Sequence, residues 1–266
     1  MVADYQSILY EESENVTTIT LNRPEVLNAI NETMGRELLD ALKAAGQDEG
    51  TRCLIITGKD RAFSAGEDIQ DLRGQYERGE NPKLGERLLS KYNPIIRRIR
   101  QTPKPVIAAV NGVAAGAGAG IAYACDIRIA SDNAKFLQAF IRVGLVPDSG
   151  TSFFLPRLVG FAKALELSLM GEELTSSDAE RLGLVAKVVQ ADQLMPTARE
   201  LAAKLSQGPT KALALTKRAM NKSLISDFET VLEYESYLQE IAGATADHTE
   251  AVRAFFEKRK PIFSGK

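Results

Sequence analysis

The stretch that decides the fold is Val110–Gly160. It reads VNGVAAGAGAGIAYACDIRIAS and, after the three residues 132–134, KFLQAFIRVGLVPDSGTSFFLPRLVG. Its Gly/Ala run, Ala114–Gly120, follows the apolar segment Pro105–Val110, which is typical of a buried strand, and leads into IAYACD, which is apolar enough for a buried helix. Small residues at a strand-to-helix turn let a ligand approach the free N–H groups at the helix start. The stretch therefore predicts a hydrogen-bonding cup for a carbonyl oxygen that becomes an oxyanion.

A second turn and one acid strengthen this interpretation. The turn Ala62–Leu72 (AFSAGEDIQDL) follows an apolar segment, Cys53–Thr57, and its Gly66–Asp68 portion can also present backbone N–H groups. Each turn alone is typical of an ordinary glycine-containing connection. Together with Asp148, the lone acid of an otherwise apolar stretch, the two turns predict a two-donor oxyanion hole beside a proton carrier. Asp148 before Ser-Gly-Thr is equally typical of a helix N-cap. The local sequence therefore leaves two roles open for Asp148, proton carrier and N-cap.

Alternating apolar patterns predict an α/β core with ligands near the ends of strands. Asn31 is the expected N-cap of the first helix, and the polar segment Gly74–Lys83 is expected to be a mobile loop. Strands are predicted at Val16–Leu21, Cys53–Thr57, Pro105–Val110 and Asp126–Ser131, and helices at Asn31–Gln47, Leu84–Gln101 and the IAYACD segment.

The last third of the chain, from Thr175 onward, is predicted to be nearly all helical. Because these helices are amphipathic and carry no obvious chemistry, we expect them to pack against other subunits or to close the core. We therefore divide the chain into a core with the active site, 1–190, and a C-terminal helical oligomerisation region, 191–266. The predicted helices are Ser177–Leu182, Asp192–Leu205, Thr210–Asn221, Asp227–Ala242 and Thr249–Lys258.

Composition narrows the class of protein. With 44% hydrophobic and 26% charged residues, the chain is typical of a globular domain, and its net charge of −2 gives no electrostatic case for nucleic acid or an anionic membrane as a partner. Cys53 and Cys125 lie in apolar surroundings and are expected to be reduced core residues. No apolar run reaches the ~18 residues of a membrane span, and the start lacks a signal-peptide pattern, so a cytoplasmic location is expected.

Several kinds of chemistry find no residues to support them. The single histidine, His248, cannot complete a Ser–His–Asp triad or a histidine metal site, and it is expected on the surface near a helix start. No phosphate-binding Gly-x-x-x-x-Gly-Lys-Ser/Thr loop occurs, and GAGAG matches a dinucleotide fingerprint only loosely. Neither a metal nor a redox cofactor is therefore expected.

Six ordered blocks, from about Tyr5 to the C-terminus, resemble the crotonase (enoyl-CoA hydratase/isomerase) superfamily. This resemblance implies a spiral of ββα repeats, a C-terminal helical trimerisation region and a homohexamer built as a dimer of trimers. It also implies an acyl-CoA thioester as substrate, so coenzyme A enters with the substrate and no separate cofactor is expected. The blocks are NRPEVLNAI (Asn22–Ile30), AFSAGEDI (Ala62–Ile69), KPVIAAVNGVAAGAG (Lys104–Gly118), ACDIRIAS (Ala124–Ser131), VGLVPDSG (Val143–Gly150) and AFFEKRKPIF (Ala254–Phe263).

The same resemblance implies roles for single residues. It places the oxyanion donors on the backbone N–H groups of Glu67 and Ala117, and it implicates only the backbone of Glu67. Phe255 and Lys258 match residues that reach the substrate from a neighbouring subunit, and Arg23 and Lys258 suit phosphate groups. The implied substrate-binding set is Arg23, Val26, Leu27, Ala65, Asp68, Ile69, Gly116, Phe140, Phe255 and Lys258, with Ala65 and Ile69 near adenine and Val26 and Leu27 along the pantetheine.

The sequence departs from the family's hydratases at the two glutamates that hold water. Those positions fall on Gly120 and Phe140, neither of which can transfer a proton. The acid lies instead at Asp148, a position that resembles the catalytic aspartate of dienoyl-CoA and 1,2-epoxyphenylacetyl-CoA isomerases. A carboxylate among Phe140, Val146 and Phe153 would be desolvated, which raises its pKa and suits a proton shuttle.

The sequence therefore favours an acyl-CoA isomerase with Asp148 as acid/base, acting in aromatic (phenylacetate) catabolism or on enoyl-CoA double bonds. One alternative is an enoyl-CoA hydratase of fatty-acid β-oxidation. Another is an aryl-CoA hydrolase or dehalogenase with Asp148 as nucleophile, against which the absence of Trp counts. A non-catalytic scaffold, acting on RNA, is disfavoured by the acidic net charge.

Overall fold

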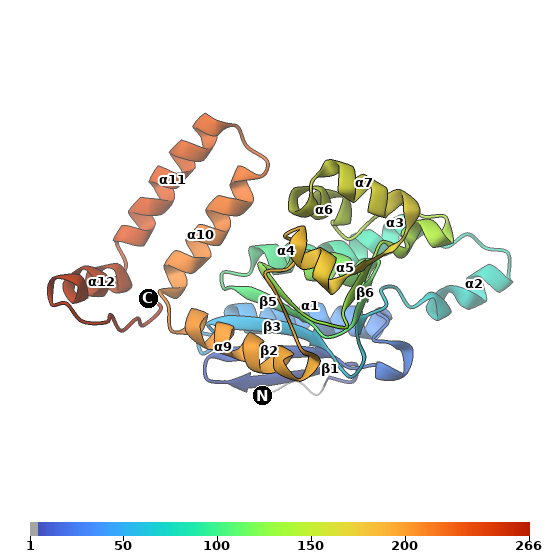
Figure 1. The fold of residues 1–266 in the computed structure, drawn as a ribbon, viewed down its shortest axis with the longest axis horizontal. Coiled ribbons are helices and arrows are strands. Elements are labelled where there is room, and N and C mark those ends of the chain that lie inside the picture. Colours follow the sequence, from blue (N-terminus) through green and yellow to red (C-terminus); the bar gives the residue numbers. More distant parts are fainter. Residues whose placement is uncertain (1–4) are drawn as a thin grey trace.

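Two sheets form the body of the protein, and the chain passes repeatedly from one to the other (Figure 1). The computed structural model describes residues 5–266, so the predicted core region begins with four residues outside it. The larger sheet runs in the order β1 (Ile8–Ser13), β2 (Val16–Leu21), β3 (Cys53–Gly58), β5 (Val106–Val110), β7 (Ile127–Ser131) and β10 (Lys187–Val189). The smaller sheet runs β4 (Ala62–Ser64), β6 (Val113–Ala115), β8 (Lys135–Leu137) and β9 (Glu173–Thr175).

Each of the pairs β3–β4, β5–β6 and β7–β8 places one strand in each sheet and is followed by helical structure. This order confirms the predicted α/β spiral of ββα repeats. The helices are α1 (Glu32–Gln47), α2 (Arg73–Glu77), α3 (Leu84–Arg87), α4 (Asn93–Gln101), α5 (Ala117–Ala124), α6 (Thr151–Val159), α7 (Phe161–Met170), α8 (Ser176–Arg181), α9 (Leu194–Ser206), α10 (Thr210–Ser223), α11 (Phe228–Gly243) and α12 (Ala246–Phe256). Short helical turns are η1 (Pro24–Val26), η2 (Ile69–Leu72), η3 (Leu88–Tyr92), η4 (Ala139–Val143) and η5 (Ala191–Gln193).

The middle strands β3 and β5 of the larger sheet are buried on both faces, as their continuously apolar sequences require. Alternate side chains point to opposite faces. Leu54 and Ile56 pack with α1, α4 and α5, whereas Cys53 and Ile55 pack with α9. The start of α1 follows the prediction, because the Asn31 side chain accepts a hydrogen bond from the Met34 N–H at 2.8 Å.

Three predicted elements are corrected by the structure. The segment Leu84–Gln101 is not one regular helix, because η3 is a π-helical turn between α3 and α4. The first residues of the predicted mobile loop Gly74–Lys83 belong to α2. An ion pair between Arg73 and Glu77, one helical turn apart, joins the two ends of this helix at 2.6 Å. The predicted all-helical region contains β10, whose three residues pair in parallel with β7 at the sheet edge. A strand of three residues is too short to show an alternating apolar pattern in the sequence, and it is held in place by its hydrogen bonds to the neighbouring strand.

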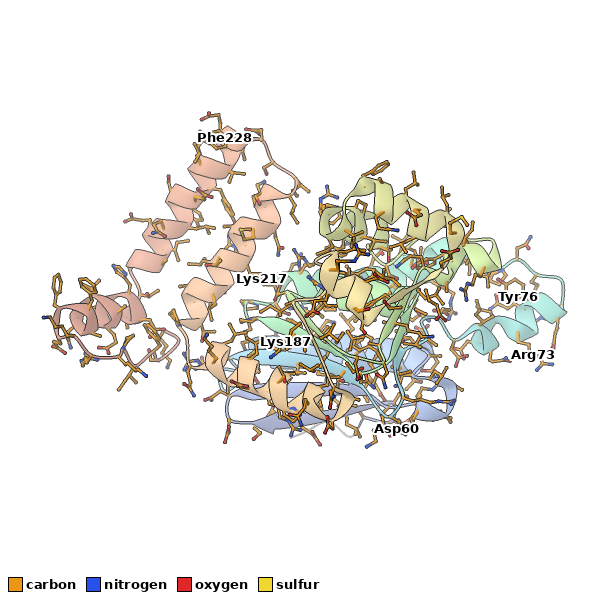
Figure 2. The ribbon with its side chains drawn as sticks, in the orientation of Figure 1. Asp60, Arg73, Tyr76, Lys187, Lys217 and Phe228 are labelled. Atoms are coloured by element: carbon orange, nitrogen blue, oxygen red, sulfur yellow. The ribbon has the colours of Figure 1, made fainter. Side chains whose placement is uncertain are left out.

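The helices α10–α12 extend away from the body (Figure 1). We call residues 210–266 the arm. Lys217 of α10, labelled in Figure 2, joins it to the body through an ion pair with Asp126 at 2.7 Å. The division at 190/191 stays a prediction, and α9 packs on the sheet of the body. Within residues 5–266, no helix combines the length and apolar character that membrane crossing demands.

Candidate active site

The two predicted turns meet at one edge of the smaller sheet. Strands β4 and β6 are parallel neighbours, so the loops that follow them leave from the same edge. Gly66 has φ +90°, and a Cβ built there would lie 2.7 Å from the Ala115 oxygen and 3.2 Å from the Ala117 nitrogen. Only glycine fits at this close approach. Gly116, with φ +51°, turns the chain into α5 so that Ala117 is its first residue.

The N–H groups of Glu67 and Ala117 remain available at this meeting point. Asp68 N donates to the Ile30 oxygen and Ile30 N donates to the Gly66 oxygen, so the bridge beside Glu67 is completed without the Glu67 N–H. Ala117 opens α5, where the first N–H groups have no partner within the helix. Within residues 5–266, neither N–H has a recorded acceptor. An oxyanion hole requires two such unpaired N–H donors that lie close together and can bind the same oxygen atom.

A pocket of about 420 Å³ opens over these donors and has mostly apolar walls. Its outer wall comes from α2, where Tyr76 is labelled in Figure 2, and from α3 and η3. The lining residues are Ala65, Glu67, Ile69, Leu72, Tyr76, Leu84, Arg87, Leu88, Tyr92, Gly116, Ala117, Ala139, Phe140, Val143, Leu145 and Asp148. We call this space the pocket.

Asp148 lies in the pocket wall and does not cap a helix with its side chain. The N-cap position of α6 is Gly150, and no side chain caps that helix. The Thr151 N–H is satisfied by the backbone oxygen of Asp148 at 2.8 Å. The carboxylate accepts a hydrogen bond from the Ser149 hydroxyl at 2.7 Å. The capping hypothesis is therefore wrong, because the tight turn at 149–150 directs the carboxylate away from the helix start.

Burial raises the pKa of the Asp148 carboxyl, and the negative charge of Glu67 raises it further, while the Ser149 hydroxyl acts in the opposite direction. A carboxyl group with a raised pKa holds a proton more readily at moderate pH. This property suits a group that must both accept and return a proton.

The two positions on which the resemblance places glutamates of the hydratases, 120 and 140, carry no carboxylate in this chain. A Cβ at Gly120 would lie 2.7 Å from the backbone oxygen and 2.8 Å from the Cβ of Ser149. The site thus lacks a carboxylate and also the space for any side chain. Phe140 is 7% exposed and lines the pocket beside Gly116, so it presents an aromatic ring where a water would have to be held.

The structure adds a polar cluster that the sequence analysis missed. The Glu67 carboxylate accepts a hydrogen bond from the Tyr92 hydroxyl and pairs with Lys91 at 2.7 Å and with Arg87 at 2.6 Å. Lys91 is 1% exposed at its side chain. Burial and the nearby Glu67 charge raise the pKa of Tyr92, so the phenol stays protonated. The only signal in the sequence was a pair of cations, Arg87 and Lys91, four residues apart on one helical face.

Of the other predicted binding residues, four lie in or near the pocket. Ala65 and Ile69 line the pocket, and Leu27 lies beside it, because its backbone oxygen accepts a hydrogen bond from the Ala65 N–H. Val26, in η1, precedes Leu27 and is half-buried.

Asp68 anchors its own turn. Its carboxylate caps η2 and pairs with Arg23 at 2.7 Å, so part of the Arg23 guanidinium is already engaged. Phe255 lies in the last turn of α12 and Lys258 follows that helix, and α12 lies at the opposite end of the molecule from α2 (Figure 1). Phe255 is 79% exposed, so it is free to touch another molecule.

A larger hollow, about 700 Å³, lies between α10 and α11 of the arm. Its lining contains one ionisable side chain, Glu235, and otherwise small, apolar or amide-bearing residues. We place the site in the smaller pocket, because only there do unpaired backbone donors and a desolvated acid come together.

Comparisons with known proteins agree on one family. A model described as enoyl-CoA hydratase/isomerase matches residues 11–266. The chain is 44% identical to 1,2-epoxyphenylacetyl-CoA isomerase of Escherichia coli over 97% of this chain and 98% of the relative. It is 37% identical to crotonyl-CoA hydratase of Syntrophomonas wolfei, over 98% and 99% of the two chains. The crystal structure of enoyl-CoA hydratase from Bacillus anthracis superposes with a TM-score of 0.91 at 32% identity, over 98% and 100% of the chains.

Proposed function

This chain belongs to the enoyl-CoA hydratase/isomerase family, and within it we propose that the chain is an acyl-CoA isomerase with one acid/base, Asp148. The observation that carries the proposal is the contrast between two positions in one pocket. Asp148 is a desolvated carboxylate in the wall, whereas the Gly120 position is filled by the backbone of Ser149. The other carboxylate of the pocket, that of Glu67, is bound by Arg87, Lys91 and Tyr92, which leaves Asp148 as the acid that can move a proton between two carbons.

In the proposed reaction, the Asp148 carboxylate takes a proton from C2, the carbon next to the thioester carbonyl. The C–H electron pair becomes an enolate, whose negative charge collects on the carbonyl oxygen. The N–H groups of Glu67 and Ala117 donate to that oxygen, and each donor of such a hole contributes roughly 2.7–4 kcal/mol of transition-state stabilisation. The protonated Asp148 then returns the proton to a different carbon, so no atoms are gained or lost.

We propose an acyl group that is either the ring epoxide of phenylacetate or an unsaturated aliphatic chain. The relative at 44% identity bears the name 1,2-epoxyphenylacetyl-CoA isomerase, which supports the first. The apolar walls, with Phe140, Tyr76 and Leu145, suit either a ring or an alkyl chain. We also propose that the arm joins subunits into a hexamer and that Phe255 and Lys258 of one copy complete the coenzyme A site of another.

The test compares isomerisation with hydration on matched substrates. Purified protein is incubated with trans-3-hexenoyl-CoA, with ring-1,2-epoxyphenylacetyl-CoA and with crotonyl-CoA, and the products are separated by mass spectrometry. We expect one of the first two to rearrange at an ordinary enzymatic rate and crotonyl-CoA to remain unhydrated. Hydration of crotonyl-CoA near the median enzyme turnover of about 10 s⁻¹ would contradict the proposal and favour the hydratase alternative.

A further inference from the structure

The Glu67 N–H, one of the two proposed oxyanion donors, belongs to a peptide that is held from its other side. In a trans peptide the C=O and the N–H point in opposite directions. The Gly66 oxygen accepts a hydrogen bond from the Ile30 N–H at 2.7 Å, so the Glu67 N–H of the same peptide points away from Ile30. The Ile30 oxygen in turn accepts from the Asp68 N–H at 3.2 Å. The direction of the donor therefore depends on how firmly Ile30 and Glu67 stay together.

One buried ammonium group contacts both sides of this bridge. Lys91, in the π-helical turn η3, lies 3.0 and 2.7 Å from the two oxygens of the Glu67 carboxylate and donates to the Ile30 oxygen at 3.4 Å. Its side chain is 1% exposed. An ammonium group has three N–H donors, so these three oxygens account for all of them. The lysine is thus fully paired, and each of its contacts lies beside the peptide that carries the oxyanion donor.

Helix α1 makes room for this lysine at Gly35. A Cβ built at that position would lie 2.7 Å from both Cγ and Cδ of Lys91, closer than real Cβ atoms approach. The backbone does not itself require glycine there, because Gly35 is not among the residues with positive φ. Glycine inside a helix is unfavourable relative to alanine. Gly35 therefore provides space that the Lys91 stem fills.

We propose that Lys91 is a positioning residue of the oxyanion hole, which keeps the Glu67 N–H directed at the thioester carbonyl oxygen. It does so by tying the Glu67 carboxylate to the Ile30 carbonyl, so that the peptide before Glu67 cannot turn without breaking these contacts. Arg87 and Tyr92 bind the same carboxylate, whereas Lys91 also reaches Ile30. This inference rests on the proposed function, because it concerns a donor used there.

Two variants disturb Lys91 in different ways. Lys91→Met removes the ammonium group and keeps a stem of similar shape, whereas Gly35→Ala keeps every charge and pushes the stem aside. The matched control is Gly46→Ala in the same helix, whose added Cβ makes only ordinary contacts with Thr102, at 3.8 and 3.9 Å. The probe is hexanoyl-CoA labelled with ¹³C at its carbonyl, which is saturated and cannot isomerise. Infrared difference spectra of the bound probe report the hydrogen bonds to its carbonyl oxygen.

A hydrogen bond to a carbonyl oxygen lowers its stretching frequency. We expect the probe to absorb at lower frequency on the wild type than in solution, and Lys91→Met to move the band part of the way back, because the Ala117 donor remains. Misplacement of a group by about 1 Å costs about 10²-fold in rate, so hydrogen–deuterium exchange at C2 of trans-3-hexenoyl-CoA should fall by about 10- to 100-fold. Gly35→Ala should change both readouts in the same direction by smaller amounts, and Gly46→Ala should match the wild type.

The double variant Gly35→Ala/Lys91→Met separates positioning from packing. The methionine stem still crosses Gly35, so a role in packing alone would add the effect of Gly35→Ala to that of Lys91→Met. Positioning by the ammonium group predicts that Gly35→Ala changes frequency and exchange little once that group is gone. Additive losses, or a wild-type frequency in Gly35→Ala, would overturn the inference. The comparison of Gly35→Ala with Gly46→Ala decides the question even if Lys91→Met does not fold.

The same measurements separate this inference from the isomerase proposal. A wild type that lowers the probe frequency but neither isomerises trans-3-hexenoyl-CoA nor exchanges its C2 hydrogens would count against the isomerase. Loss of the lowered frequency in Lys91→Met and Gly35→Ala would still support the role of Lys91. Isomerisation by the wild type, with the same carbonyl frequency in both variants, would overturn the role of Lys91 and leave the isomerase standing. A wild-type frequency equal to that of the free probe would overturn the oxyanion hole and both proposals with it.

Discussion

The body and the arm differ in how much apolar core they bury, because the body encloses a large core whereas the arm buries few large apolar side chains. In the body, residues such as Ile19, Leu54 and Phe63 have no exposed surface at all. In the arm, Phe228 and Phe256 are 71% and 76% exposed. Exposed apolar residues in such numbers mark interaction surfaces. The body thus builds its own core and contains the pocket, whereas the arm has little core of its own, and we expect another molecule to cover its apolar faces.

The largest effect should come from Asp148→Asn, which separates chemistry from folding inside the body. General acid–base groups contribute 10²–10⁴-fold, so isomerisation and exchange at C2 should fall by about that factor. Stability should change little, because the side chain caps no helix and asparagine can still accept from the Ser149 hydroxyl. Kinetics in heavy water and thermal unfolding check the two halves. Exchange at the wild-type rate would place the base elsewhere.

A charged substitution on the arm should weaken the association of subunits while the body stays folded. Fully burying a side chain as large as Phe contributes about 1.5–3 kcal/mol, so Phe228→Glu should weaken association at least tenfold if that face is covered. Light scattering across a dilution series measures this, beginning from the expected wild-type hexamer. Phe161→Glu, equally exposed but on α7 of the body, is the matched control. If Phe161→Glu dissociated the subunits and Phe228→Glu did not, the interface would lie on the body and not on the arm.

A smaller effect is expected at Gly120, a crowded position of the body. Gly120→Ala places a Cβ 2.7 Å from the Ser149 backbone oxygen, and overpacking of this kind costs about 1–3 kcal/mol of unfolding free energy. Gly85→Ala, with nothing within 4 Å of its added Cβ, should be neutral or stabilising by up to about 1 kcal/mol. Urea unfolding of both variants gives the difference. Equal stability would show that the Ser149 segment yields easily.

The smallest effect concerns one hydrogen bond at the edge of the body. Asn31→Ala removes the acceptor that holds the Met34 N–H and should lower the unfolding free energy by ~1 kcal/mol. Activity should remain, since α1 lines no part of the pocket. Asn31→Asp, which restores an N-cap acceptor, should recover most of the stability in the same unfolding experiment.

What the sequence could predict depended on how local each feature is. The Gly66 and Gly116 turns and the Asn31 cap depend on neighbouring residues, and the structure confirms them, whereas the role given to position 120 rests on the resemblance and stays a prediction. The bonds of Lys91 and Tyr92 to Glu67 join residues 24 and 25 positions apart. An amphipathic helix pattern does not reveal what its polar edge will touch. The same reason hid β10, which has meaning only beside β7.

The contact between Gly120 and Ser149 also bears on how this pocket could change. An acidic side chain at position 120, where the resemblance places a glutamate of the hydratases, would enter a volume that the Ser149 backbone already occupies. Single substitutions there lead first to a poorly folded protein. The turn at 149–150 would have to be rebuilt beforehand, and that turn carries Asp148. For the isomerase proposed above, a laboratory selection for hydration would therefore have to change the turn that holds Asp148 before an acid could be accommodated at position 120.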